Sequence, residues 1–495
     1  MTDLMPGFTA QVADAVQAAL SAARARGAYA IARGQARHDA SVLVINGRTE
    51  HLGVSRGRGV GVQAFTASGH GGFAASDDPA TGAEVAQRAV DLAHEAGARD
   101  LETNLEIFQV PPLVAHDPAE PWAPPDLPAV EAALTALNEA VRKRDARLSV
   151  RSSFSVTHDA WQVGRTDGTD VRYTLRRARL GHEITARGEH GAATTSAGVV
   201  GVDVALLGDA EALARLAQRA RRAADLAIAL LDAPRLASGS YKLVIDHALA
   251  KGLAHEAFGH AAETDSMQAS ILGEEGRFRR GERVAPSYVS ILDGPLPADY
   301  AYQPYSSNGE RRQTVTIVRA GVLDEALADT FSARRAGVPP TGAARVEHFA
   351  ALPMPRMTNT RILVDDPISL PHDPDEVTPE QMRALLLAHG LMQQDERVLF
   401  LTGYRGGQVN TSLGDFVFQC TAIHDLSDLT LYQPAIFSGK VLSVLSAIRA
   451  GIGDPRLDAP GMCGKRGQSV PSSGGSHAFL LVDAHPEVRV GGAAA

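Results

Sequence analysis

Hydrophobic and polar residues alternate with two different periods along this chain, and each period marks one type of secondary structure. Residues 8–26 repeat valine and leucine at helical spacing, which predicts an amphipathic helix. Residues 41–77 alternate apolar and polar positions around turn pairs such as Asn46-Gly47, a pattern typical of antiparallel hairpins. Residues 77–79 then lead into a second predicted helix, which starts at TGAEV (81–85) and runs through about residue 98. The N-terminal pattern therefore indicates an α+β unit.

The same mixture continues through the next part of the chain. Residues 110–128 are rich in proline, which favours an extended connector over a helix or a central strand. Helices are predicted at 129–144 and 209–231. The glycine-punctuated alternation between them predicts strands, with a turn at Asp167-Gly168.

A break near residue 235 divides the chain. The segment APRLASGS at 233–240 ends the preceding helix, and YKLVID, which follows it, predicts a buried strand. A chain of 495 residues is longer than one core usually organises. We therefore expect two α+β domains, 1–235 and 236–495, each with a largely antiparallel sheet and packed helices.

Composition and charge exclude two classes of partner. Apolar residues make up 44% of the chain and charged residues 21%, as in an ordinary globular protein. Lys and Arg total 48 against 57 Asp and Glu, and there is no long basic run, so nucleic acid is not an expected partner. No apolar run reaches the roughly 18 residues that a membrane helix needs. The start of the chain does not resemble a signal peptide, and we expect a cytoplasmic protein.

The stretch with the clearest chemistry is LAHEAFGHAAETD, at 253–265. Its HExxxH pattern places Glu256 between two potential ligands, His255 and His260, as in a metal-dependent hydrolase. In a regular α-helix, positions i and i+5 lie about 140° apart, so the two imidazoles would not face one ion. A π-bulge at Gly259 would align them, and we predict one. Alternatively, the histidines are held by backbone groups or carboxylates and bind no metal.

Four separated blocks of the sequence resemble the TldD/PmbA family of metallopeptidases, and its TldD branch in particular. The family's other branch lacks the histidine motif. The matching blocks, in chain order, are HEAFGHAAETD at 255–265, LPMPRMTNT at 352–360, GGQVN followed by GDFVF within 406–418, and GMCGKRGQSVP at 461–471.

This resemblance implies a zinc ion held by His255, His260 and Cys463, with Glu256 as the general base that hydrolyses peptide bonds. Two imidazoles and one thiolate favour zinc over hard ions such as magnesium. Family members act on unfolded or small modified peptides and commonly pair with a metal-less TldE/PmbA-like subunit. We therefore expect such a heterodimer or a homodimer. The second cysteine, Cys420, is expected to be a small buried hydrophobe.

Other residues of these blocks have two possible roles each. Glu263 and Asp265 either orient a ligand imidazole or form a solvated helix end. Arg356 and Asn359 either contact the substrate or the metal loops, or they brace a loop beneath the site.

Two further stretches are candidates for substrate recognition. Gly406 and Gly407 begin an alternating strand whose bare edge could bind an extended peptide through main-chain hydrogen bonds, although a simple strand bend is the alternative. The polar segment 266–312 is expected to be a loop with a tight turn at Asp293-Gly294, shaping access to the metal.

The sequence thus predicts a zinc metallopeptidase. One alternative is a dedicated amide or dipeptide hydrolase that tailors a secondary-metabolite intermediate. The other is a non-catalytic partner subunit that binds peptide.

Overall fold

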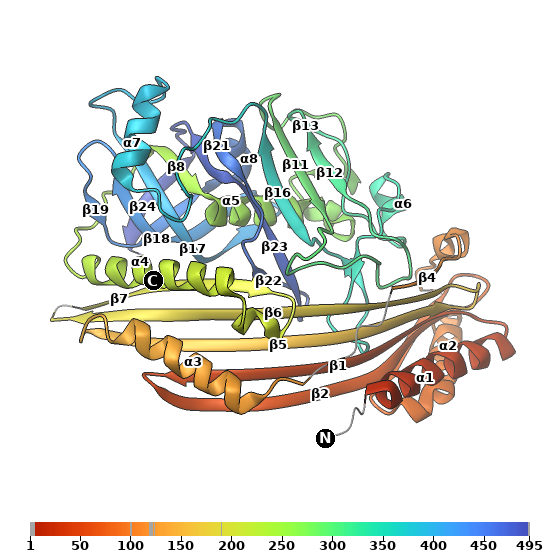
Figure 1. Cartoon of the computed structure of the whole chain (residues 1–495). Helices are drawn as coiled ribbons and strands as arrows, with labels where there is room; N and C mark the ends of the chain where they lie inside the picture. Colours follow the sequence, from red (N-terminus) through yellow and green to blue (C-terminus); the bar gives the residue numbers. More distant parts are fainter. Residues whose placement is uncertain (1–4, 100, 118–121, 123, 190, 494–495) are drawn as a thin grey trace.

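Two large sheets organise the protein in the computed structural model, which describes residues 5–493 apart from 100, 118–121, 123 and 190. A seven-stranded sheet is formed within residues 29–201, and a thirteen-stranded sheet within 242–493. Figure 1 shows the long strands of the first sheet as a platform beneath the second half of the chain. Most strand pairs are antiparallel and helices pack on both sheets, so the α+β prediction is confirmed.

The first sheet has the strand order β3-β2-β1-β5-β6-β4, and β7 also pairs with β6. Its elements are α1 (Met5–Ala25), β1 (Tyr29–Ile45), β2 (Arg48–Phe65), β3 (Gly71–Ser76), α2 (Gly82–Ala98), β4 (Val114–His116), α3 (Leu127–Arg142), β5 (Leu148–Arg165), β6 (Asp170–Gly188), β7 (Gly191–Gly201) and α4 (Ala210–Ala229).

The predicted hairpin turn at Asn46-Gly47 is confirmed, since both residues have positive φ and join β1 to β2. Strand β1 nevertheless begins at Tyr29, well before the predicted start. Its first half carries the fully buried Arg33, whose guanidinium donates to the carbonyl oxygen of Ser307. Because buried positions of this half of β1 hold polar side chains, the sequence there lacks the alternation of apolar and polar residues that predicts a strand.

The proline-rich connector lies partly outside the described residues, at 118–121 and 123. In its described part the only strand is β4, three residues long, which pairs in parallel with β6. This agrees with an extended connector.

The second sheet contains β8 (Lys242–Asp246), β11 (Val289–Gly294), β12 (Val315–Arg319), β13 (Val322–Leu323), β16 (Asn359–Val364), β17 (Val398–Asn410), β18 (Asp415–Asp425), β19 (Leu431–Tyr432), β20 (Ala435–Lys440), β21 (Ile448–Arg456), β22 (Gly461–Lys465), β23 (Gln468–Val482) and β24 (Val488–Ala493). Two small hairpins and four helices complete this half: β9 (Gly273–Glu274), β10 (Arg277–Phe278), β14 (Ala344–Arg345), β15 (Met354–Pro355), α5 (His247–Leu253), α6 (Ala333–Ala336), α7 (Pro379–Ala388) and α8 (Val441–Ser446).

Helix α4 connects the two halves. The carboxylate of Asp209 caps its first turn, and two of its arginines reach the C-terminal half. The Arg219 Nε donates to Asp375 at 2.9 Å, and Arg222 donates to the carbonyl oxygen of Val377 at 2.8 Å. The division at 235/236 falls between the two sheets and stays a prediction as a domain boundary.

Strand β8 and helix α5 position the candidate chemistry. The middle of β8 is buried between its neighbours β17 and β23, as the sequence predicts for YKLVID. The Asp246 carboxylate then accepts the backbone N–H of Leu249 at 2.9 Å and begins α5. The helix is buried in the core of the C-terminal half.

The predicted turn at Asp293-Gly294 is wrong, because both residues lie in β11. Asp293 is fully buried. Its carboxylate pairs with the Arg312 guanidinium at 3.3 Å and accepts the backbone N–H of Thr358 at 3.0 Å. These donors offset the cost of burying the charge, so an Asp-Gly pair that usually marks a turn lies within a sheet here.

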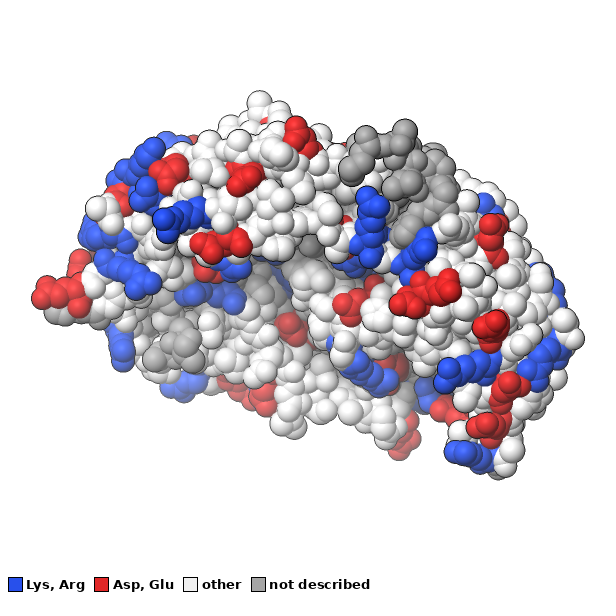
Figure 2. All heavy atoms as spheres, turned by 90° about the horizontal axis from the view of Figure 1, so that it is seen from below, with Lys and Arg blue, Asp and Glu red and all other residues white. Residues whose placement is uncertain are grey.

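Charged side chains of both signs are mixed on one face of the molecule (Figure 2). On the face viewed from below, Lys and Arg are interspersed with Asp and Glu around a hollow (Figure 2). Among the helices described, none is long and apolar enough to cross a membrane.

Replacing Asn138 in α3 with alanine is expected to destabilise the first sheet. The buried amide donates to the carbonyl oxygen of Val150 at 2.9 Å and accepts the N–H of Gly47 at 2.8 Å. With the bond from the same amide to the Ser152 hydroxyl at 2.8 Å, the substitution removes three hydrogen bonds of a fully buried side chain, so the free energy of unfolding should fall by about 3 kcal/mol. The free energy of unfolding is measured by denaturant titration, with Lys143→Ala, at an exposed position, as the control. An equal decrease in the two variants contradicts the prediction.

Candidate metal centre

The two motif histidines share one face because the helix changes its winding between them. Helix α5 continues into one π-helical turn, Ala254–Gly259, and then into a tight turn that begins at His260. A π-turn aligns positions i and i+5. The rings of His255 and His260 accordingly meet edge to face, with centroids 5.2 Å apart. The predicted bulge is confirmed.

At Gly259 the constraint on a larger residue comes from space rather than from backbone conformation. Its φ of -62° is open to any residue. A β-carbon at this position, however, would lie 2.3 Å from the sulfur of Met357. The glycine therefore lets the segment before β16 approach the π-turn closely.

Cys463, on β22, completes a three-residue cluster with the histidines. Its Sγ lies 3.3 Å from the Nε2 of His260, and one potential ligand atom from each of the three residues falls within 4.8 Å of the others. His255 and Cys463 are almost fully buried, with 3% and 1% of their surface exposed. Three nitrogen and sulfur ligands with room for a fourth are the donor set of a catalytic zinc.

A buried carboxylate orients the second histidine. The Glu263 Oε2 lies 3.1 Å from the Nδ1 of His260, and it also accepts from the Lys465 ammonium at 2.8 Å. A hydrogen bond from the Nδ1–H of His260 to Glu263 leaves Nε2, which faces the Sγ of Cys463, as the atom that would bind a metal ion in place of its proton. Asp265 takes part only indirectly, by accepting from Lys465 at 2.6 Å. Glu263 therefore makes the contact expected of a residue that orients a ligand imidazole, and it is not part of a solvated helix end.

The electrostatics of the cluster suit a bound cation. Burial lowers the pKa of His260, but the negative charges of Glu263 and Cys463 outweigh it and hold that pKa well above its usual value. Burial, with Lys251 and His260, lowers the pKa of His255 far below its usual value, so this imidazole is neutral. A neutral imidazole is the form that binds metal. The Nδ1 of His255 is also buried without a hydrogen-bond partner among the described residues.

Glu256 lies beside the cluster, in the same π-turn. Burial raises the pKa of its carboxyl, while the positive charges of His260 and Lys251 act in the opposite direction. A carboxylate with a raised pKa is a better proton acceptor near neutral pH.

Arg356 and Asn359 are both fully buried. The Arg356 guanidinium donates to the carbonyl oxygen of Cys463 and lies 3.8 Å from the carboxylate of Glu263. The Asn359 amide donates to the carbonyl oxygen of Leu457 at 2.9 Å. Arg356 therefore contacts a metal loop, the contact of Asn359 matches the bracing alternative, and a contact of either residue with substrate stays an untested prediction.

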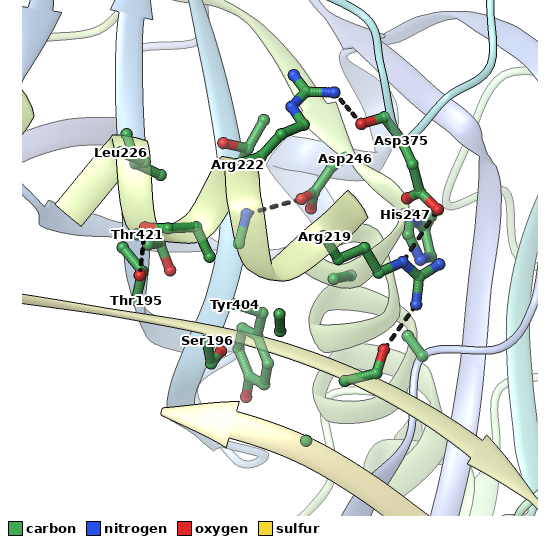
Figure 3. A pocket seen from close by; sticks show the side chains of 18 of the residues that line it. Thr195, Ser196, Arg219, Arg222, Leu226, Asp246, His247, Asp375, Tyr404 and Thr421 are labelled. Atoms are coloured by element: carbon green, nitrogen blue, oxygen red, sulfur yellow. Dashed lines mark hydrogen bonds and ion pairs between the residues drawn. The ribbon is translucent and has the colours of Figure 1, made fainter. Parts of the chain in front are cut away.

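A cavity of about 1010 Å³ lies between the first sheet, α4, the start of α5 and β17. Figure 3 shows side chains from these elements around it, among them Arg219, His247 and Tyr404. Lys251 and Tyr404 line the cavity and both interact electrostatically with Glu256, which does not itself line it. Neither was predicted as a site residue.

Gly406 and Gly407 lie where β17 leaves its neighbour. The strand pairs with β8 only as far as Leu401, and beyond that no described strand occupies this edge. The register with β18 shifts between Tyr404 and Gly407, and Gly406 has a φ of +112° that only glycine adopts easily. The bend and the open edge are both present, while peptide binding there stays a prediction.

Three sequence profiles of the PmbA/TldA metallopeptidases match successive parts of this chain: domain 1 at residues 30–96, the central domain at 119–231 and the C-terminal domain at 238–472. Together they cover most of it in order. The chain therefore belongs to the PmbA/TldA metallopeptidase family.

Known relatives agree with this assignment. A protein named "Metalloprotease" from Methanothermobacter thermautotrophicus is 27% identical over 91% of this chain and 93% of its own length. A "Zinc metalloprotease TldD homolog" from Saccharolobus solfataricus is 26% identical over 48% of this chain and 50% of its own. The crystal structure of TldE from Thermococcus kodakarensis has the same fold, with a TM-score of 0.69 at 14% identity, and covers 94% of this chain and 97% of that one.

The substitution Gly259→Ala should weaken metal binding. The added methyl group would push against Met357 and displace the π-turn, which costs about 1–3 kcal/mol and moves His260 away from Cys463. Zinc affinity, measured by competition with a chelating dye, should fall about tenfold or more.

Removing the obstacle provides the control for this prediction. The double variant Gly259→Ala with Met357→Ala should recover much of the affinity, because the methyl group then has room. An unchanged affinity in Gly259→Ala alone contradicts the steric argument.

Proposed function

We propose that this chain is a zinc-dependent peptidase that hydrolyses peptide bonds of unfolded or small modified peptides. The supporting observation is the cluster of His255, His260 and Cys463, whose potential ligand atoms lie within 4.8 Å of one another beside Glu256. These three residues would hold the zinc. When bound, zinc supplies a Lewis acid for the peptide carbonyl and lowers the pKa of a water molecule.

The residues of this chain would move and hold protons around that centre. Glu256 takes a proton from the attacking water and later delivers it to the leaving amine, since its raised pKa suits both steps. Glu263 keeps the Nδ1 proton of His260 in place, and Lys465 and Arg356 hold Glu263. The nitrogen and sulfur donors therefore keep their orientation during the reaction.

The cavity and the open edge of β17 support an extended peptide as substrate. The cavity volume of about 1010 Å³ is large for a single amino acid and matches several residues of a chain. Main-chain hydrogen bonding at Gly406 and Gly407 would bind such a peptide with little side-chain selection.

The likeness to TldE supports a paired assembly. We infer that the chain works in the cytoplasm as a heterodimer with a metal-less TldE/PmbA-like subunit, or as a homodimer.

Replacing Glu256 with glutamine should abolish hydrolysis without loss of metal. Glutamine keeps the shape but cannot accept the proton, so kcat should fall at least about a hundredfold on an unstructured peptide. Hydrolysis is measured by mass spectrometry and zinc by elemental analysis of the same samples.

The same assay separates the alternatives. Unchanged hydrolysis in Glu256→Gln removes this residue from the mechanism. Activity confined to one small amide favours the dedicated hydrolase, and a zinc-loaded native protein that cleaves neither substrate class favours the non-catalytic subunit.

Cys463→Ser should lose most of the zinc, because the hydroxyl is a much weaker ligand than a thiolate. The matched control is Cys420→Ala, since Cys420 is equally buried but lies outside the cluster. Elemental analysis should show near-full zinc in the control and little in Cys463→Ser. Equal zinc contents would refute the third ligand.

A further inference from the structure

Lys251 is a buried lysine on the wall of the cavity, one helical turn before His255. Only 5% of its surface is exposed, and it lines the cavity together with His247 and Ala248 of the same helix. Positions four apart lie on one face of a helix, so Lys251 is presented on the side of His255. The proposed mechanism does not use it.

The Lys251 ammonium has little to compensate its charge. Its single hydrogen bond among the described residues is a long one, 3.3 Å, to the hydroxyl of Ser472. No described carboxylate forms a salt bridge with it. A β-carbon at Gly461 would lie 2.7 Å from its Nζ, so the ammonium is pressed against the start of β22. A buried charge of this kind is costly unless an anion comes close.

The protein's own anions near Lys251 already have other tasks. Cys463 and Glu256 both lie within electrostatic reach of the ammonium. The thiolate of Cys463, however, faces His260 as a potential ligand, and Glu256 is the proposed proton acceptor. No described carboxylate is within salt-bridge distance of the ammonium, and because Lys251 lines the cavity, the carboxylate of a ligand bound there would supply such a partner.

We propose that Lys251 binds the terminal carboxylate of the peptide substrate and so directs cleavage to the C-terminal end of the chain. This inference rests on the proposed peptidase function and names its substrate class, peptides with a free carboxylate. Lys251 is a specificity residue in this role.

The position of Lys251 along the helix fits a terminal carboxylate. Four residues of helix separate it from His255 by about 6 Å along the axis. An extended peptide advances roughly 3.3–3.6 Å per residue. In a peptide that runs along this helix with the cleaved bond beside Glu256, a carboxylate one or two residues beyond that bond would come to the level of the ammonium.

The test compares acetyl-tetraalanine bearing a free carboxylate with the same peptide as its C-terminal amide. Binding to zinc-loaded Glu256→Gln protein is measured by calorimetry, so turnover does not interfere. The free acid should bind at least tenfold more tightly than the amide. Adding Lys251→Met, which keeps the length of the side chain without its charge, should remove the difference by weakening the acid alone.

Two further variants control this experiment. Lys440→Met removes the same charge from an exposed ion pair with Asp415 and should preserve the preference for the acid. Lys251→Gln provides a second neutral replacement in case the methionine variant does not fold.

The outcomes are distinguishable. Equal affinity for acid and amide in the Glu256→Gln protein overturns the proposal without any Lys251 variant, and an equal loss for both peptides in Lys251→Met assigns the lysine a purely structural role. If the native enzyme cleaves neither peptide but the acid preference is present and depends on Lys251, the peptidase function fails and the carboxylate site stands. Cleavage of both peptides with equal kcat/KM by the native enzyme leaves the peptidase and overturns the role of Lys251.

Discussion

The structure of the metal centre depends on one extra residue in one helical turn. Without the π-turn at Ala254–Gly259, the imidazoles of His255 and His260 would point about 140° apart, and no side-chain rotation could bring both to Cys463. Met357 packs closely against this turn, and a β-carbon at position 259 would lie 2.3 Å from its sulfur. The backbone geometry of the π-turn and the packing of Met357 therefore meet at Gly259.

Around this turn, buried charges hold one another in place. Glu263 is fully buried, and it contacts a histidine, a lysine and an arginine that come from three separate parts of the chain. Each of the three also contacts another group: Lys465 binds Asp265, Arg356 binds the carbonyl of Cys463, and His260 faces the Cys463 sulfur. The carboxylate thereby links the histidine side of the cluster to the cysteine side.

Much of this could be predicted from the sequence, where the signal is local. The π-turn follows from the five-residue spacing next to a glycine. Cys463 was found only through family resemblance, since nothing local relates it to His255. Lys251 was missed because a lysine in an alanine-rich helix usually faces water, and only the packing of β22 and β23 buries it. The turn at Asp293 was predicted wrongly because its carboxylate is buried by partners that are distant in sequence, Arg312 and Thr358.

The distance in sequence between His260 and Cys463 has a consequence for folding. The two residues are 203 positions apart, yet their side chains touch. A metal ion that joins them acts as a reversible cross-link closing a very long chain loop, and a covalent link of that span removes on the order of 5 kcal/mol of unfolded-state entropy. Metal supply would then set how long the C-terminal half survives in the cell as well as whether it is active.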